Sequence, residues 1–195
     1  MAFQPHVINK EDHFIAGWYI NHDVCDQLID FFESKSDIHT PGVLGINSQV
    51  DKTLKDSTDI TINDFYHVAP VNDYFDQLSQ VVDLYKGRYP WCGDQQNAWG
   101  INSGVQIQRY LPGEGYHQWH SEIDGTNNAS RHLVFMTYLN DVNDAGETHW
   151  FYQNLKLKPE KGLTVIWPPA WTHMHKGITS PTESKYIVTG WYNYL

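Results

Sequence analysis

The stretch RHLVFMTYLNDVNDAGETHWFYQNLKLKPEKGLTVIWP, residues 131–168, decides the fold. Short segments rich in Val, Ile, Leu, Phe, Tyr, Trp and Thr alternate in it with turns that contain Asn, Asp, Gly and Pro. Short strands separated by such turns are typical of a β-sandwich or jelly roll. The same pattern appears in residues 104–111, 174–179 and 185–195. We therefore predict a strand-rich core over residues 96–195.

The first half of the chain carries two patterns with a helical period. Residues 21–35 place apolar side chains at helical spacing after Asn21, a residue type that caps helix N-termini. Residues 71–89 form a second amphipathic pattern, which we expect to end at Gly87. The apolar stripe of this second pattern contains Val71, Phe75, Leu78, Val82 and Tyr85. Two helices are therefore expected before the strands begin.

Helices followed by strands predict an α+β fold in which the helices brace one sheet. Residues 35–59, between the two helical patterns, contain mostly turn and loop residues. A chain of 195 residues fits one domain. We predict a single domain over residues 1–195, in which residues 1–95 form a helical and loop region that supports the core.

The composition favours a globular protein whose partner is a peptide or a small molecule. Hydrophobic residues make up 41% and aromatic residues 14%, which is ample for a packed core. The formal net charge of −10 repels phosphate backbones, so we expect no nucleic-acid partner, and a neutral or basic peptide fits this field better. Apolar runs stay well short of the ~20 residues of a membrane span, and no signal-peptide or CxxC pattern occurs. We therefore expect no membrane partner and a cytoplasmic setting.

Residues 115–125, GYHQWHSEIDG, raise the question of a metal site. His120 and Glu122 are two residues apart, and such residues point to the same face of a strand. His117 is at odd spacing from both and would point elsewhere. An isolated H-x-E pair is also compatible with a hydrogen-bonded, half-buried strand end. A metal site would need a third ligand from another strand, and the candidates are His132, His149, His173 and His175.

Two histidines and one carboxylate are the facial triad of non-haem Fe(II) oxygenases, which leaves positions open for a co-substrate and dioxygen. The C-terminal segment offers a second unusual feature. Lys185, Ile187, Thr189 and Trp191 alternate onto one face of a predicted strand. The bulky residues of that face predict that it points inward, where a lysine needs a partner of opposite charge.

The chain from about residue 106 to the C-terminus resembles the Fe(II)- and 2-oxoglutarate-dependent dioxygenases of the prolyl 4-hydroxylase type. Four motifs in the family's order carry the resemblance. They are QRYLPGEGYHQWHSE (108–122), RHLVFMTYLNDVNDAGETHWF (131–151), LKPEKGLTVIW (157–167) and HKGITSPTESKYIVTGWY (175–192). The resemblance implies a double-stranded β-helix (jelly roll) core with the cofactor Fe(II). It also implies 2-oxoglutarate and dioxygen as co-substrates, and ascorbate is compatible with it.

The resemblance further implies His120, Glu122 and His175 as the metal ligands. His175 is followed by Lys176-Gly177, and Lys185 lies ten residues later, as in collagen-type prolyl hydroxylases. His173 shares the strand parity of His175, so strand geometry alone does not separate the two. If His173 is not a ligand, it is an ordinary polar neighbour or orients a ligand.

The remaining site residues are also implied by the resemblance. Lys185 would bind the distal carboxylate of 2-oxoglutarate, with hydroxyl groups beside it to share the contact. The residues that would supply these hydroxyls are Tyr110, Thr148 and Tyr138. Arg131 would lie near the substrate entrance and Trp191 on the substrate side of the iron. Trp119 and Trp150 are further candidates for the mouth of the site.

The sequence departs from the family pattern at four places. The carboxylate is Glu122 where most prolyl hydroxylases have Asp, and one additional residue separates Tyr116 from His120. A bulge or a longer turn would absorb the additional residue. Val134 stands where Thr is usual, and Ala145 stands where the first Gly of a Gly-Gly pair is usual. The first two departures fall beside the substrate mouth and weaken a prolyl substrate more than the oxygenase class.

We therefore expect an oxygenase that hydroxylates a C–H bond of a peptidyl proline or similar residue, with release of succinate and carbon dioxide. One alternative is the same chemistry on a free amino acid or small metabolite. An alternative of another class is a non-enzymatic, cupin-like metal-binding jelly roll. A nucleic-acid demethylase conflicts with the net charge. Whether residues 42–58 fold over the site is left open by the sequence.

Overall fold

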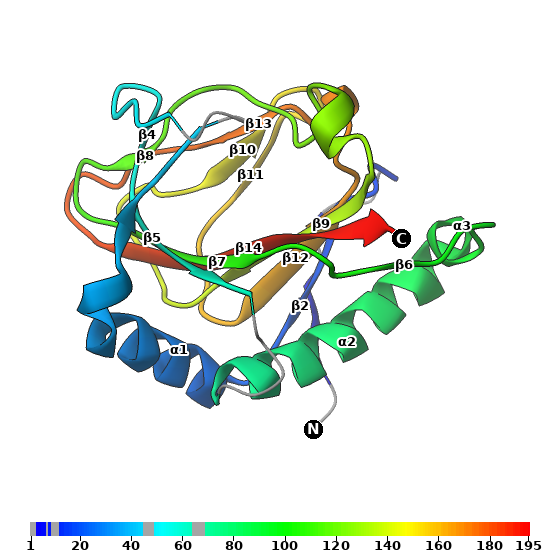
Figure 1. Ribbon diagram of the computed structural model, residues 1–195, viewed down its shortest axis with the longest axis horizontal. Coiled ribbons are helices and arrows are strands. Elements are labelled where there is room, and N and C mark those ends of the chain that lie inside the picture. Colours follow the sequence, from blue (N-terminus) through cyan, green and yellow to red (C-terminus); the bar gives the residue numbers. More distant parts are fainter. Residues whose placement is uncertain (1–2, 7, 9–11, 45–48, 64–68) are drawn as a thin grey trace.

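Helices cover one face of a large antiparallel sheet, and smaller sheets lie on its other side (Figure 1). The structure is a computed structural model that describes residues 3–6, 8, 12–44, 49–63 and 69–195. The helices are α1 (His22–Ser34), α2 (Val71–Arg88) and α3 (Pro90–Gly93), and the 3-10 turns are η1 (Ser36–Ile38), η2 (Thr126–Asn128) and η3 (Trp171–His173). None of the described helices is both long enough and apolar enough to cross a membrane.

The strands are short except for β9 and β14, which run through the middle of the large sheet. The strands in the first half of the chain are β1 (Pro5–His6), β2 (Ala16–Tyr19), β3 (Thr40–Pro41), β4 (Lys55–Asp56) and β5 (Thr58–Ile62). Those in the second half are β6 (Trp99–Gly100), β7 (Val105–Tyr110), β8 (Gly115–Tyr116), β9 (Arg131–Tyr138), β10 (Thr148–Trp150), β11 (Leu155–Leu157), β12 (Leu163–Trp167), β13 (His175–Gly177) and β14 (Lys185–Tyr194).

The large sheet has nine strands in the order β1-β2-β12-β9-β14-β7-β5-β3, with β6 paired to β14. A three-stranded sheet has the order β11-β10-β13, and β4 pairs with β8. Every pair in these sheets is antiparallel. A large antiparallel sheet faced by smaller ones and braced by helices confirms the α+β prediction and is consistent with a jelly-roll core.

The first half of the chain also contributes strands to the large sheet. β2 pairs with β12, and β5 pairs with β7. We did not predict β5, which begins at the end of the segment read as mostly turn and loop. Its apolar pattern is interrupted because Asp59 is buried there and accepts hydrogen bonds from Ser57 and Gln108. A buried carboxylate hides the alternation of apolar and polar residues that marks a strand.

The two long helices form where the sequence pattern placed them. Asn21 caps α1, and its side chain accepts a hydrogen bond from the N–H of Asp23 at 2.9 Å. Most of the predicted apolar stripe of α2 is buried, and Phe75 is half-buried. α2 continues through Gly87, where we expected it to end, to Arg88. Pro90 accounts for the later end, because proline disfavours helical backbone in the residue before it.

Two apolar clusters occupy the two faces of the large sheet. The cluster between this sheet and the helices includes Phe32, Leu78, Ile107, Phe135 and Val188. The cluster on the opposite face includes Val134, Tyr138, Trp150, Trp167 and Ile187. Burying a large apolar side chain stabilises a fold by roughly 1.5–3 kcal/mol, so both clusters hold the sheet firmly in place. The neighbours Ile187 and Val188 belong to opposite clusters, which fixes the two faces of β14.

Candidate metal and co-substrate site

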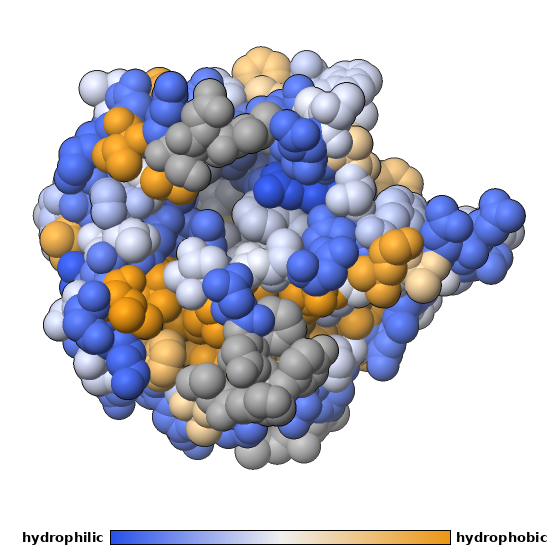
Figure 2. All heavy atoms as spheres, in the orientation of Figure 1, coloured by the Kyte–Doolittle hydropathy of each residue, from blue (hydrophilic) through white to orange (hydrophobic). Residues whose placement is uncertain are grey.

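A cavity of about 790 Å³ opens on the face of the large sheet that lies away from the helices. Its lining includes residues of β7, β9 and β14 from the large sheet and of β10 and β13 from the small one. Figure 2 shows a hollow near the middle of the face turned toward the viewer. The β14 residues that we predicted to share an inward face all line the cavity: Lys185, Ile187, Thr189 and Trp191. A concave site with a few charged groups is the usual form of a small-molecule site.

Backbone pairing brings His120 and His175 together. They form an isolated antiparallel bridge, in which the N–H of each residue donates to the carbonyl of the other at 3.0 and 2.9 Å. We predicted that His120 and Glu122 lie in a strand. Neither lies in a regular strand, and among the described residues the only strand-like pairing at this point is the bridge between His120 and His175. Glu122 is held instead by its own N–H, which donates to the carbonyl of Pro169 at 3.0 Å.

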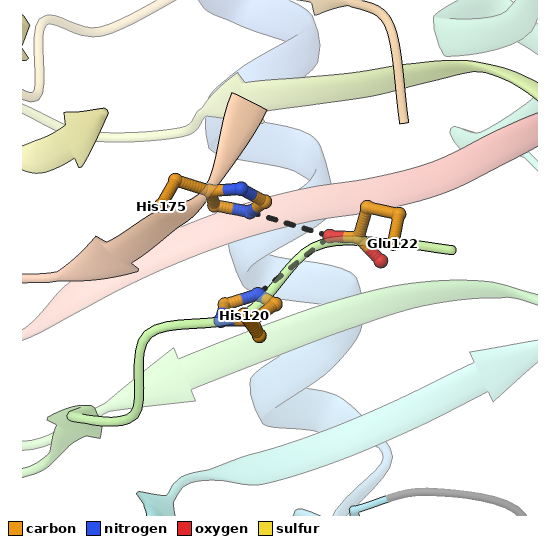
Figure 3. Close-up of side chains that lie close together, drawn as sticks. All are labelled: His120, Glu122 and His175. Carbon is orange, nitrogen blue, oxygen red and sulfur yellow. Dashed lines mark ion pairs between the residues drawn. The ribbon is translucent and has the colours of Figure 1, made fainter. Parts of the chain in front are cut away.

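The side chains of His120, Glu122 and His175 point toward one another (Figure 3). The Oε1 atom of Glu122 lies 3.3 Å from Nε2 of His175 and 3.7 Å from Nε2 of His120. The potential ligand atoms of the three residues all lie within 4.8 Å of one another. Two imidazole nitrogens and one carboxylate oxygen are the donor set of a facial triad.

Backbone carbonyls fix how both imidazoles are presented. Nδ1 of His120 lies 3.0 Å from the carbonyl oxygen of Gln118, and Nδ1 of His175 lies 2.9 Å from that of His173. A carbonyl oxygen only accepts, so each Nδ1 carries the ring proton and donates it. Each Nε2 is therefore left with a lone pair directed at the shared centre, which is how a metal-binding histidine is usually oriented.

The ionisation of the site suits a cation. Burial, together with the charge of His175, lowers the pKa of His120, which favours the neutral imidazole that can bind a metal. Burial by itself raises the pKa of Glu122, but the two neighbouring histidines outweigh it and hold that pKa well below its ordinary value. These shifts favour a neutral imidazole at His120 and a charged carboxylate at Glu122.

His173, the alternative ligand, does not face Glu122. It is buried, and its two ring nitrogens lie 3.0 Å from the carbonyl of His13 and 3.0 Å from the hydroxyl of Thr172. Its own carbonyl is the group that orients His175. The other histidines considered contact groups elsewhere: His132 lies near Cys92, His149 near Trp119 and His117 near Thr179. Of the candidate histidines, His175 is the one that the fold places beside Glu122.

A β-bulge absorbs the additional residue between Tyr116 and His120. The N–H groups of His117 and Gln118 both donate to the carbonyl of Leu54, at 2.8 and 3.2 Å. Two successive donors opposite one carbonyl are the pattern of a bulge. The ring of Tyr116 then stacks on that of His120, with centroids 3.8 Å apart and planes 8° apart. The departure in sequence therefore leaves His120 within reach of Glu122.

Lys185 brings a buried positive charge to the cavity wall. Its Nζ donates to the carbonyl of Gly146 at 2.9 Å and lies 5.1 Å from the ring centroid of Tyr110. None of the ion pairs formed within the described part of the chain includes Lys185. Burial disfavours the ammonium and lowers the pKa of Lys185 to about 8, although the charge of Glu147 opposes this. The structure thus contains a buried cation in need of an anion.

Hydroxyl groups lie around this end of the cavity. Tyr110 and Thr148 both line it. The hydroxyl of Tyr110 donates to Oε1 of Gln108 at 2.8 Å. Tyr138 is fully buried behind the wall, and its hydroxyl donates to that of Thr148 at 2.6 Å. Tyr138 therefore contacts the cavity through Thr148.

Arg131 and Trp191 both line the cavity and both contact Glu122. The indole N–H of Trp191 donates to Oε2 of Glu122 at 2.9 Å. Nη1 of Arg131 lies 3.2 Å from the same oxygen and 2.6 Å from the backbone carbonyl of Glu122. The guanidinium also lies 3.7 Å from the ring centroid of Trp191. These donors hold Oε2 while Oε1 faces the histidines, so the longer glutamate side chain is fixed in orientation.

One polar cluster of the cavity wall was not predicted from the sequence. Lys55 and Asp59 form a buried ion pair at 2.9 Å, and Gln108 donates to the same carboxylate oxygen at 3.1 Å. Lys55 also lies 5.7 Å from the ring centroid of Tyr116, which stacks on His120. Lys55 and Asp59 are four residues apart, but Gln108 comes from a strand about 50 residues further along the chain, so no local pattern could have indicated the whole cluster.

The structure also separates the two tryptophans suggested for the mouth. Trp119 lines the cavity, whereas Trp150 is fully buried and packs edge-on against Trp167. The segment 42–58 contributes several lining residues, and its residues 45–48 lie outside the described part of the chain. The lining residues from this segment are Val43, Leu44, Gln49, Asp51, Leu54 and Lys55.

The cavity lies within the part of the chain that matches a known family. Residues 105–193 match the family model of the 2OG-Fe(II) oxygenase superfamily. This span contains the three residues of the triad and Lys185. The search of curated proteins gave no match.

Several solved structures have a similar fold at low sequence identity. A Pseudomonas putida prolyl-4-hydroxylase is 16% identical, with 93% of each chain covered and a TM-score of 0.70. A Trichoplax adhaerens prolyl hydroxylase, solved with a hypoxia-inducible-factor peptide fragment, is 16% identical, with 93% of this chain and 84% of that chain covered and a TM-score of 0.71. The viral collagen prolyl hydroxylase of Paramecium Bursaria Chlorella virus-1, solved with 2OG, is 17% identical, with 93% and 97% covered and a TM-score of 0.66.

The family match and the shared fold agree with the chemistry of the cavity. The donor set of His120, Glu122 and His175 suits iron, and the matched segment also contains the buried lysine. The match favours an enzyme over the cupin-like alternative. Residues 105–193 therefore indicate a 2-oxoglutarate- and Fe(II)-dependent oxygenase domain, and the chain has a fold similar to that of prolyl hydroxylases.

Proposed function

We propose that His120, Glu122 and His175 bind the iron, and that the enzyme hydroxylates a C–H bond of a peptidyl proline or similar residue. The convergence of three ligand atoms in one cavity, beside a buried ammonium without an acidic partner among the described residues, is the observation that carries this proposal. A metal site alone would fit many proteins, and a buried lysine alone would lower the stability of the fold without a functional reason. Together they match the needs of one metal and one dicarboxylate.

The residues present fit Fe(II). The donor set has two nitrogens and one oxygen, and each Nδ1 donates to a carbonyl, so both Nε2 atoms are free to bind. The carboxylate Oε2 is held by Trp191 and Arg131, which leaves Oε1 for the metal. A preorganised set of this kind lowers the cost of ordering the ligands when the cation binds.

The residues at the other end fit 2-oxoglutarate. A buried ammonium without a carboxylate partner is costly, and the distal carboxylate of a dicarboxylate would remove that cost. Tyr110 and Thr148 offer hydroxyls beside it, while Tyr138 orients Thr148 from behind. We propose that Lys185 is the main anchor because, unlike the hydroxyl groups of Tyr110 and Thr148, it can carry a positive charge.

The bound iron and 2-oxoglutarate would activate dioxygen, which is the oxidant: one oxygen atom would enter the substrate and the other the succinate, with release of carbon dioxide. The chain supplies binding, orientation and exclusion of water. Arg131 and Trp191 hold the carboxylate ligand at the wall of the cavity, where a substrate would enter. Apolar groups such as Met136 and Ile187 line the same cavity and limit the access of water. Ascorbate, as a further reductant, stays a prediction.

We further propose that the large and small sheets together form a double-stranded β-helix, and that residues 1–195 act as one domain around it. The cavity lies on the sheet face where the smaller sheets pack, which supports this arrangement. The solved prolyl hydroxylases with a similar fold support a proline-type substrate, and one of them carries a bound peptide. A free amino acid or small metabolite is the alternative, because the cavity is large enough to enclose one.

A coupled turnover assay tests the proposal. Protein reconstituted anaerobically with Fe(II) and 2-oxoglutarate, and then given oxygen, should release succinate slowly. Addition of the true substrate should raise succinate release and shift the substrate mass by one oxygen atom. A panel of proline-rich peptides, free proline and other amino acids separates the peptide substrate from the small-metabolite alternative. Absence of succinate under all conditions would contradict the proposed reaction.

A further inference from the structure

Four aromatic side chains form a continuous row beside the cavity, which we call the aromatic ridge: Trp119, Phe151, Tyr152 and Trp171. The ring centroids of Trp119 and Phe151 are 5.2 Å apart and those of Phe151 and Tyr152 are 5.3 Å apart. The row ends at Trp171, whose ring centroid lies 6.0 Å from that of Tyr152. All three contacts are edge-to-face, an arrangement that leaves ring faces open to a partner.

The ridge is unusually exposed. Phe151, Tyr152 and Trp171 have 57%, 59% and 66% of their surface accessible. Among the described residues, Phe14 and Trp91 are the only other exposed aromatic side chains. Three of five such rings therefore gather at one place. Contiguous apolar groups on a surface commonly mark an interaction site.

The backbone presents these rings in a defined way. The N–H of Phe151 donates to the carbonyl of Met174 at 2.8 Å. The side-chain amide of Gln153 donates to the carbonyl of Thr172 at 3.0 Å. The turn that follows β10 is thus tied to η3, so the rings on these two segments keep their relative positions. A partner would meet a preformed surface, which reduces the ordering cost of binding.

The ridge is continuous with the cavity. Trp119 lines the cavity and directly precedes His120, while η3 leads through Met174 into His175. A molecule with one part inside the cavity could therefore lie along the ridge with another part. A free amino acid would be too short to use both.

The local charge at the ridge is opposite in sign to the net charge of the protein. Nζ of Lys176 lies 4.9 Å from the ring centroid of Trp119, and the ring of His149 lies 5.0 Å from it. The pKa of His149 is lowered by burial and then by the positive charges of Lys156 and Lys176, which outweigh the opposing charge of Glu147. The net charge of −10 suggested a neutral or basic peptide, whereas this surface favours acidic groups.

We propose that the aromatic ridge binds the flank of a proline-containing peptide with acidic side chains while its target residue occupies the cavity. This inference rests on the proposed function and selects a peptide over a small metabolite. Proline-rich segments adopt an extended helix without internal hydrogen bonds, and aromatic surfaces recognise them through ring stacking and donors to their carbonyls. The indole and phenol groups of the ridge offer both kinds of contact.

Direct binding separates this inference from catalysis. Two labelled twelve-residue proline-rich peptides, identical except that one carries Glu and the other Lys at two flanking positions, are titrated with the full chain without iron. The parent protein should bind the Glu peptide more tightly than the Lys peptide. The double variant Phe151→Ser/Trp171→Ser should bind the Glu peptide at least about tenfold more weakly. Lys176→Gln should reduce the preference for the Glu peptide.

The matched control is Trp91→Ser on α3, which removes an even more exposed ring, 79% accessible, away from the ridge. It should leave peptide binding unchanged. Equal binding by parent and double variant would overturn the inference, and so would failure of the parent to bind either peptide. Tighter binding of a sugar oligomer, cellohexaose, than of either peptide would also overturn it. So would a dimer that the parent protein forms in solution and the double variant does not form. Succinate release by the same preparations reports separately on the oxygenase reaction.

Discussion

The two ends of the cavity are built in opposite ways. At one end, each member of the triad is held by a further group, because carbonyls orient both imidazoles and two donors fix Glu122. At the other end, Lys185 donates to a single carbonyl and pairs with no carboxylate of the described residues. At the first end, the protein itself orients all three ligands, and only a cation is needed to complete the site. The second is incomplete until an anion arrives, and this difference indicates what each end binds.

The largest effect should come from breaking the complete end. His175→Ala removes one donor of the triad, so iron affinity should fall more than about 100-fold and succinate release should fall to background. His173→Gln is the discriminating control, because its ring faces His13 and Thr172 rather than Glu122. It should keep the iron if it remains folded, as checked by thermal unfolding. Loss of iron in His173→Gln but not in His175→Ala would reverse the ligand assignment.

The incomplete end should respond in a different way. Lys185→Met should raise the 2-oxoglutarate concentration needed for half-maximal turnover by roughly 100-fold, since it removes a buried charge partner. Iron affinity should change little, because Lys185 does not contact the triad. The two readouts come from co-substrate titration and anaerobic metal titration. Equal co-substrate dependence in variant and parent would reject the anchoring role.

The same substitution should stabilise the protein in the absence of 2-oxoglutarate. The pKa of Lys185 is about 8 in the folded state, below its ordinary value of 10.5. The unfolded chain therefore binds more protons between these values, so parent stability should rise with pH across about 8 to 10.5. Below that window the charged lysine destabilises the fold, and Lys185→Met should remove on the order of 2–3 kcal/mol of this cost. Chemical denaturation at pH 7 and pH 10 measures it, and a larger gain at pH 10 would contradict the sign.

A milder change tests the bracing of Glu122. Trp191→Phe keeps a ring for Arg131 to stack on but removes the N–H that donates to Oε2. Iron affinity should fall about tenfold, as is usual for the loss of a group that orients a metal ligand. Trp99→Phe, a half-buried tryptophan that packs near His132, is the matched control and should keep parent affinity. Identical metal affinity in both variants would mean that Trp191 does not position Glu122.

Co-substrate binding should also depend on pH through Lys185. Only the protonated lysine attracts a carboxylate, so affinity for 2-oxoglutarate should fall by about tenfold between pH 7 and pH 9. Lys185→Arg keeps its charge over this range and should flatten the dependence. Calorimetric titration of the two proteins at several pH values checks this. A parallel fall in both would assign the dependence to another group.

The smallest expected effect concerns the turn that supplies the carbonyl for Lys185. Ala145 has a φ of 61°, a left-handed conformation that favours glycine, and it stands where the family has Gly. Ala145→Gly should therefore stabilise the fold by about 1 kcal/mol. Ala129→Gly, at a φ of −65°, is the control and should be neutral or slightly destabilising. The denaturant concentrations at the unfolding midpoint of the two variants and the parent measure this effect. An unchanged midpoint in Ala145→Gly would mean that the backbone at Ala145 is not strained.

Much of the fold and part of the site could be predicted from the sequence. The helices and long strands follow from apolar periodicity, and the inward face of β14 follows from alternation at Lys185 and Trp191. β5 was missed because its Asp59 is buried between Lys55 and Gln108 of β7, and the pairing with β7 that buries it is not visible in the local sequence. The strand assigned around His120 is a single bridge instead, because the pairing depends on His175, far away in the chain.

The contacts of Arg131 and Trp191 with Glu122 were not predictable for a related reason. Alternation shows which face a residue lies on, but it does not show what its polar atoms reach. The additional residue predicted a bulge or a longer turn, and the donation of His117 and Gln118 to one carbonyl fits a bulge. Sequence therefore predicted where groups lie better than which groups they bind.

The position of the iron tests the assignment of the metal ligands most directly. Crystals grown anaerobically with Fe(II) and 2-oxoglutarate would locate the metal by anomalous diffraction at the iron edge. We expect one peak about 2.0–2.2 Å from Nε2 of His120, Oε1 of Glu122 and Nε2 of His175, with a carboxylate of 2-oxoglutarate at Lys185. A peak bound by other histidines, or a co-substrate that does not reach Lys185, would contradict this expectation.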